Sequence, residues 1–209
     1  RRPEVLELFR ANMFGRVPIH VRNELRFEVL EQGEALQGHA KRLQVRLFFS
    51  AADDAAFVDL LIYLPAIANR RDACPMFLGL NFMGNHTITN DPLVYVTKSW
   101  VRNKTEIGYQ NNQASVSARG TSATRWPIRL LIDSGFGVAT AYYGDIDPDF
   151  DDGFKNGVHA VYPLDDNRNG QQWGSIATWS WGLSRILDYL QTIESVNPKQ
   201  IGVIGHSRL

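Results

Sequence analysis

Apolar and polar residues alternate in the first half of the chain in a way that predicts an antiparallel pair of strands. In KRLQVRLFFS, the side chains of Leu43, Val45, Leu47 and Phe49 fall on one face and the polar residues between them fall on the other. AFVDLLIYLP predicts a second strand, which ends at Pro65 because proline lacks the N–H that would continue a ladder. The polar segment SAADDA between them is typical of a hairpin connection.

Later in the chain the apolar runs become nearly continuous, as expected for strands that are covered on both faces. Three segments have this character, and they are MFLGLNF, FGVATAYY and QIGVIG. Between and before them lie three predicted helices, PEVLELFRANMFGRVP, WPIRLLIDSG and QWGSIATWSWGLSRILDYLQT. The last is the most strongly periodic, with an apolar face made of Ile176, Trp179, Leu183, Ile186, Leu187 and Leu190.

The order of these elements predicts an α/β fold, with a mostly parallel sheet and an antiparallel N-terminal edge. A polar segment from Gly84 to about Thr124 interrupts this order. Connections of that length are usually functional or disordered, so we expect part of a binding site there. We find no internal repeat and no boundary between domains, so the 209 residues are expected to form one domain.

Composition narrows the function classes. Lys+Arg and Asp+Glu both number 22, and the resulting zero net charge argues against a nucleic-acid-binding protein. No apolar run reaches the roughly 20 residues that a membrane span needs, so we expect no membrane association. Cys74 is the only cysteine, which rules out an intrachain disulfide.

The candidate chemistry lies at the end of the chain, where QIGVIG runs into His206, Ser207 and Arg208. A serine on a sharp turn after a buried strand is the nucleophile arrangement of α/β-hydrolases, whose pattern is G-x-S-x-G. Leu209 stands where that pattern has its second glycine. Alternatively, a serine after a strand caps the next helix by accepting a bond from a free backbone N–H.

Arg208 also has two interpretations. The residue after the nucleophile donates its backbone N–H to the oxyanion, and a guanidinium at that position adds a charged donor. Alternatively, Arg208 is a surface residue at the start of a helix that pairs with an acid.

Four segments together carry a resemblance to a known family, and they are GHSRL, FLGLNFMGNHT, ATAYYGDIDPDFDDGF and WGLSRILDYL. The chain resembles the bacterial glucuronoyl esterases of carbohydrate esterase family 15, whose nucleophile motif is G-x-S-R-x-G. The resemblance runs from the opening helix to Leu209 and covers the N-terminal half or so of such a domain.

This resemblance implies an α/β-hydrolase that cleaves esters between 4-O-methyl-glucuronic acid on xylan and lignin alcohols. By the resemblance, Ser207 is the nucleophile and Arg208 is the side-chain oxyanion donor. The family's histidine and acid follow the nucleophile in the chain. We therefore expect residues 1–209 to be a single incomplete α/β-hydrolase domain, truncated at the nucleophile elbow and inactive alone. No cofactor is expected, the protein is expected to be a monomer, and the family is secreted or periplasmic.

Other candidate sites are weaker. Asn85 and His86 follow the first buried strand, where they could contact a sugar, although a histidine in a loop is more often structural. The aspartate-rich segment 145–152 does not fit an EF-hand, because Asp152 replaces the required glycine and Val158 the required glutamate. These aspartates are expected to shape the pocket. Trp173, Trp179 and Trp181 are expected to be at least partly core residues, and no metal site is assigned.

Two other functions remain open from the sequence. One is an acetyl-xylan esterase or another carbohydrate esterase on the same fold. The other is a carbohydrate-binding relative without catalytic activity.

Overall fold

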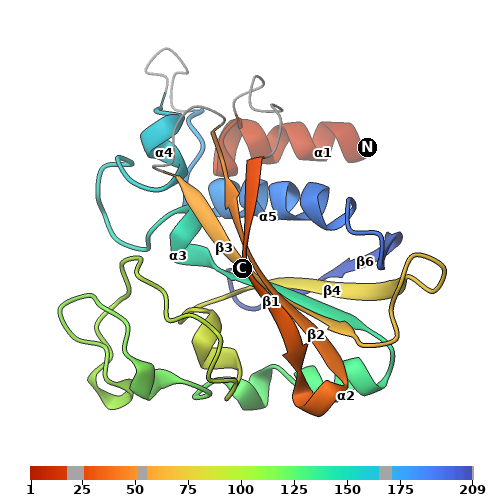
Figure 1. Cartoon of the computed structure of the whole chain (residues 1–209). Coiled ribbons are helices and arrows are strands. Elements are labelled where there is room, and N and C mark those ends of the chain that lie inside the picture. The colour runs from red at the N-terminus through yellow and green to blue at the C-terminus, as the bar shows by residue number, and fades with distance from the viewer. Residues whose placement is uncertain (18–25, 51–55, 165–170, 209) are drawn as a thin grey trace.

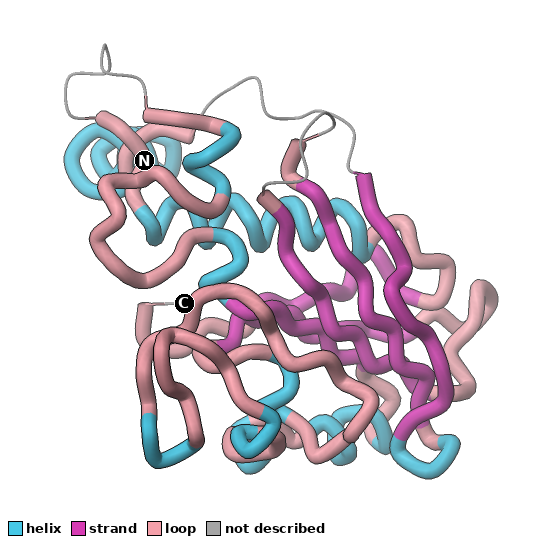
Figure 2. The backbone as a smooth tube through the Cα atoms, turned by 60° about the vertical axis from the view of Figure 1, so that its left-hand side comes forward, coloured by secondary structure: helices cyan, strands magenta, loops and turns pink. Residues whose placement is uncertain are grey.

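The computed structural model describes residues 1–17, 26–50, 56–164 and 171–208, and these contain one six-stranded sheet. Its strands, in chain order, are β1 (Arg26–Ala35), β2 (Ala40–Phe48), β3 (Phe57–Pro65), β4 (Cys74–Asn81), β5 (Gly137–Tyr142) and β6 (Val196–Val203). They lie side by side in the order β1-β2-β3-β5-β4-β6. The strands fan through a pronounced twist, which Figure 2 shows as the change of direction between one end of the sheet and the other.

The helices lie on both faces of this sheet. They are α1 (Arg2–Phe9), α2 (Ile128–Asp133), α3 (Tyr143–Ile146), α4 (Val158–Val161) and α5 (Ser175–Leu190), with a π-helical turn η1 at Arg10–Phe14. Figure 1 shows α1 and α5 on one side of the sheet and α2 on the other. Single 3-10 turns occur in the connections, and they are η2 (Leu36–Gly38), η3 (Asn85–Ile88), η4 (Thr105–Ile107), η5 (Val116–Ala118) and η6 (Ala123–Arg125). No helix within the described ranges is long and apolar enough to cross a bilayer.

Alternation along β3 divides the core into two layers. Leu60, Ile62 and Leu64 pack into the larger hydrophobic cluster, which includes the buried side chains of α5. Leu61 and Tyr63 point the other way and pack with Ile128 and Ile132 of α2. Successive side chains of a strand point to opposite faces, so the sheet is covered on both sides and the molecule has three layers.

The predicted α/β class with an antiparallel N-terminal edge is confirmed. β2 and β3 pair antiparallel, with Ala40 opposite Pro65 and Phe48 opposite Phe57. The hairpin connection predicted at SAADDA lies mostly outside the described residues. β4 is parallel to both β5 and β6, whereas β3 and β5 are antiparallel. Three of the five pairings between described strands are therefore antiparallel, and the parallel arrangement is restricted to β5, β4 and β6. The described sheet is mixed instead of mostly parallel as the sequence predicted.

Two sequence expectations need correction. The apolar face assigned to α5 included Ile176, but this side chain is 45% exposed, and Trp181 and Tyr189 are buried instead. The strand predicted at QIGVIG is present in β6, but Val203 is 58% exposed in the described structure, so this strand is not covered on both faces. The three tryptophans 173, 179 and 181 are core residues, as expected.

Candidate active site

The chain turns sharply directly after β6, and this turn carries Ser207. The backbone φ angle of Ser207 is +58°, in the left-handed region that non-glycine residues rarely adopt. The serine is exposed. A helix N-cap residue normally has extended backbone geometry, so the conformation of Ser207 does not support the capping interpretation. It matches the strained turn on which α/β-hydrolases present their nucleophile.

The turn lies at the edge of the sheet where β4, β5 and β6 end. These three strands are parallel, so their carboxyl ends share one edge. The backbone after β6 packs closely against Gly79 of β4 and leaves no room for a side chain there. A Cβ atom at Gly79 would lie 2.9 Å from the carbonyl oxygen of Ile204. Open α/β sheets bind their ligands in the crevice outside the carboxyl ends of the strands. Ser207 therefore stands at the expected position for a reactive group.

Three aromatic rings surround the guanidinium of Arg208. Its Cζ atom lies 6.0 Å from the ring centroid of Phe82, 5.8 Å from that of Tyr143 and 5.6 Å from that of Trp179. Contacts of this kind attract a cation to the ring faces. Because Phe82 belongs to the loop after β4, this loop borders the turn, and the ring of His206 also packs edge-on against Phe82 at 6.2 Å.

A carboxylate holds the same guanidinium from another side. Nη2 of Arg208 donates to Oδ2 of Asp149, which follows β5 and α3 in the chain. Tyr143 donates its hydroxyl to this oxygen at 2.8 Å, and Arg102 does so through Nη2 at 3.3 Å. Burial, together with the bond to Asp149, raises the pKa of Tyr143 to about 12, so it stays a donor at neutral pH. Asp149 also lines a cleft of about 400 Å³ with Arg102, Pro148, Phe150, Asp151, Asp152, Phe154 and Ser175.

Comparison with known proteins shows which family the chain is similar to. A model of the family "Glucuronyl esterase, fungi" matches residues 109–209. Carbohydrate esterase MZ0003, from an unknown prokaryotic organism, is 47% identical over 211 residues, which cover 100% of this chain and 48% of that protein. A promiscuous CE15 esterase from the marine bacterial metagenome is 45% identical, with a TM-score of 0.85 over 100% of this chain and 51% of its own. The chain belongs to the CE15 esterase family.

A second solved structure agrees. The glucuronoyl esterase from Solibacter usitatus is 38% identical, with a TM-score of 0.88 over 100% of this chain and 52% of its own. The chain therefore spans about half the length of the relatives that it matches.

In this CE15 chain, Asn85 and His86 are enclosed by protein rather than facing the cleft. Asn85 donates to the carbonyl oxygen of Asp59 at 2.7 Å and accepts from Asn81 at 2.8 Å. His86 is fully buried, with Nε2 located 3.0 Å from the hydroxyl of Tyr109, and burial lowers its pKa to about 4. Both side chains fix the loop after β4, and their placement does not support the predicted contact with a sugar.

The aspartate-rich segment separates into buried and surface carboxylates. Burial raises the pKa of Asp147 to about 6, and burial with the nearby charge of Asp59 raises the pKa of Asp145 to about 7. Asp145 accepts a bond from the backbone N–H of Asp59 at 3.1 Å. Across the part of the chain that the structure describes, no three His, Cys, Asp or Glu side chains gather closely enough to hold a metal ion. Within this segment, Asp145 binds the backbone of β3 and Asp149 lies next to Arg208.

A serine nucleophile needs a base, and the described histidines do not supply one through a hydrogen bond to Ser207. His159 is buried with Nε2 located 3.0 Å from Thr178 Oγ1, and burial lowers its pKa to about 4. His39 pairs with Asp133 at 3.1 Å, at the other end of the sheet. None of the four described histidines, which are His39, His86, His159 and His206, exchanges a hydrogen bond with Ser207.

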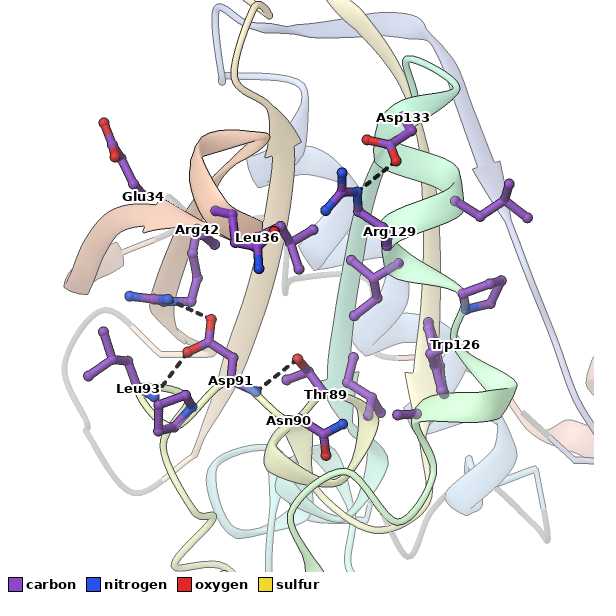
Figure 3. A pocket seen from close by; sticks show the side chains of 18 residues that line it. Glu34, Leu36, Arg42, Thr89, Asn90, Asp91, Leu93, Trp126, Arg129 and Asp133 are labelled. Atoms are coloured by element: carbon purple, nitrogen blue, oxygen red, sulfur yellow. Dashed lines mark hydrogen bonds and ion pairs between the residues drawn. The ribbon is translucent and has the colours of Figure 1, made fainter.

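A larger groove of about 1050 Å³ lies away from this site (Figure 3). It is bordered by the turn between β1 and β2 and by α2, next to the amino-terminal end of β5. Its floor contains Arg42, which binds Asp91 and Glu31, each at 2.6 Å. The described residues that line it do not include any residue of the turn that carries Ser207.

The sequence alone indicated Ser207 and Arg208 but not the contact between Arg208 and Asp149. Asp149 was one of five aspartates in a short segment, and the sequence offered no reason to prefer it. Arg102 lies in the long polar segment, where part of a binding site was expected. Nothing in the sequence distinguished Arg102 from the other residues of that segment. The available indication was that the aspartates follow a buried strand, as ligand-site residues in such sheets do.

Proposed function

We propose that the protein is a serine carboxylic ester hydrolase that cleaves 4-O-methyl-glucuronoyl esters between xylan and lignin alcohols. Ser207 attacks the ester carbonyl, the alcohol leaves, and water releases the glucuronate from the acyl-enzyme. The backbone N–H and the guanidinium of Arg208 stabilise the oxyanion, together with an N–H from the loop after β4. No cofactor takes part in this scheme.

The observation that carries the proposal is the exposed, left-handed Ser207 on the turn after β6, followed by a cation. Left-handed backbone at a non-glycine residue costs about 1–2 kcal/mol and persists where function requires it. The similarity to glucuronoyl and carbohydrate esterases supplies the substrate class.

A base and an acid are still needed, because an unactivated serine hydroxyl is a weak nucleophile. In hydrolases of this fold the acid and the histidine follow the serine in the chain. We place both of them after Leu209, in the portion that the relatives have beyond this chain. The 209 residues alone are then expected to be inactive.

Substitution of Ser207 tests the proposal. In the full-length protein, Ser207→Ala should lower kcat on a benzyl ester of glucuronic acid by at least about 10³-fold. Ser184→Ala is the matched control, because Ser184 is an exposed serine on α5. Circular dichroism should show the same fold for both variants. Retained activity in Ser207→Ala would reject the proposed nucleophile.

The same assay separates the alternatives. Faster turnover of acetylated xylan than of glucuronate esters would favour an acetyl-xylan esterase. Xylan binding without turnover of either substrate would identify a non-catalytic relative.

The substrate polymer lies outside the cell, so we propose that the protein is secreted or periplasmic and acts as a monomer. Fractionation of the producing cells and the elution volume of the full-length protein in gel filtration check these two points.

A further inference from the structure

One carboxylate oxygen connects three separate segments of the site. Oδ2 of Asp149 accepts from Arg208 on the turn after β6, from Tyr143 at the start of α3 and from Arg102 in the long polar segment. Arg102 makes a second contact, to the backbone carbonyl of Asp149 at 3.0 Å. The Asp149 side chain is only 18% exposed, so the carboxylate that receives these donors is largely shielded from water.

Arg208 is held on several sides and yet remains accessible. The rings of Phe82, Tyr143 and Trp179 enclose its guanidinium, while its side chain is 44% exposed. A guanidinium has five N–H donors in a planar array. The bond from Nη2 to Asp149 leaves further donors for a group bound beside Ser207.

The charges around this oxygen explain why a carboxylate is needed. Two guanidinium groups, those of Arg102 and Arg208, point their Nη2 atoms at Asp149 Oδ2. Without the negative charge these two cations would repel each other, and Arg208 would be free to turn toward solvent. A charge that stabilises an oxyanion is effective when it is already in place before the reaction begins.

We infer that Asp149 is a positioning residue that fixes Arg208 for oxyanion stabilisation. This inference rests on the proposed function, because it assigns a task to Arg208 in ester cleavage. Asp149 itself does not touch the reacting atoms, and it acts through the guanidinium. In hydrolases of this fold the acid that orients the catalytic histidine follows the serine in the chain, so that role is not assigned to Asp149.

A double-mutant cycle in the full-length enzyme tests the inference, with the benzyl ester of glucuronic acid as substrate. Arg208→Met is expected to lower kcat by about 10²–10³-fold, the usual effect of losing an oxyanion donor. Asp149→Asn is expected to lower kcat by about 10–100-fold with KM changed less than threefold. If Asp149 acts only through Arg208, the double variant loses no more activity than Arg208→Met alone.

A control variant separates positioning from a general effect of losing a negative charge. Asp72→Asn removes the same charge from an exposed side chain in the connection between β3 and β4, which does not line the cleft with Asp149. It should keep kcat within about threefold of the wild-type value.

The results can overturn the inference without touching the proposed function. In one outcome, Ser207→Ala is inactive while the double variant loses kcat by the product of the losses in Asp149→Asn and Arg208→Met. In that case the positioning role is wrong, and Ser207 is still supported as the nucleophile. If Ser207→Ala is active, the proposed function fails first. Should Asp149→Asn not fold, Asp149→Glu keeps the charge but displaces it by one methylene. That variant should lower kcat at an unchanged melting temperature, and an unchanged kcat would reject the inference.

Discussion

The backbone N–H of Ile204 donates a hydrogen bond of 2.8 Å to the carbonyl oxygen of Leu78 in β4. Ile204 is the first residue after the end of β6. Together with the close approach of the Ile204 carbonyl to Gly79, this bond fixes the end of β6 against β4. The turn that carries Ser207 therefore starts from a rigid position in the sheet. The left-handed conformation of Ser207 costs free energy, which the surrounding fold must supply.

The strain at Ser207 predicts that glycine and alanine at this position differ in their effect on stability. Glycine adopts positive φ angles without steric cost, whereas alanine does not. Ser207→Gly should therefore be more stable than Ser207→Ala by about 1 kcal/mol in free energy of unfolding, with both variants inactive. Urea denaturation of the full-length variants measures this difference. Equal stability of the two would mean that the turn is not strained.

Arg42, Glu31 and Asp91 form a buried ion cluster beside the groove in Figure 3. Removal of the Arg42 guanidinium is expected to cause a large loss of stability. The Arg42 side chain is 2% exposed and faces both Glu31 and Asp91. Arg42→Met would leave two poorly solvated carboxylates without their partner, at a cost of about 3–5 kcal/mol in free energy of unfolding. Arg129→Met is the matched control, because the pair Arg129–Asp133 is 46% and 44% exposed and is screened by solvent, so its loss should change stability little. Chemical denaturation of both variants checks the contrast, and similar losses would contradict it.

The buried Asp145 predicts a specific dependence of stability on pH. Its pKa is raised from 3.8 to about 7 in the folded protein, mainly by burial and then by the charge of Asp59, while Arg46 acts in the opposite direction. Between these two values the folded state binds more protons than the unfolded state, so this residue's contribution to stability falls as the pH rises. Above about pH 7 the loss is complete.

Asp145→Asn mimics the protonated carboxyl and should remove this dependence. Relative to the wild-type protein, the variant should gain stability on the order of 2–4 kcal/mol between pH 4 and pH 8. Denaturation curves of both proteins at several pH values measure the gain, with the exposed Asp151→Asn as a control for loss of charge. A difference between the two curves that does not change with pH would show that Asp145 ionises normally.

The sequence predicted the elements whose apolar residues follow a regular pattern along the chain, and it failed where that pattern was interrupted. β2 and β3 were recognised by alternation, and β4, β5 and β6 by continuous apolar runs. β1 was not recognised, because charged residues interrupt its apolar positions and Phe27 and Val29 stay exposed. Its strand conformation depends on pairing with β2, which the residues of β1 alone do not reveal.

The sequence by itself determined the α/β order of elements, the antiparallel edge, and a serine with an adjacent arginine after the last predicted strand. These properties follow from neighbours only a few residues apart, through side-chain periodicity and turn chemistry. Only the tertiary structure decided that Arg208 is held by Asp149, 59 positions earlier in the chain, and that Asn85 and His86 are enclosed. Such contacts depend on which strands become neighbours in the sheet, and that arrangement is fixed by the packing of the whole molecule.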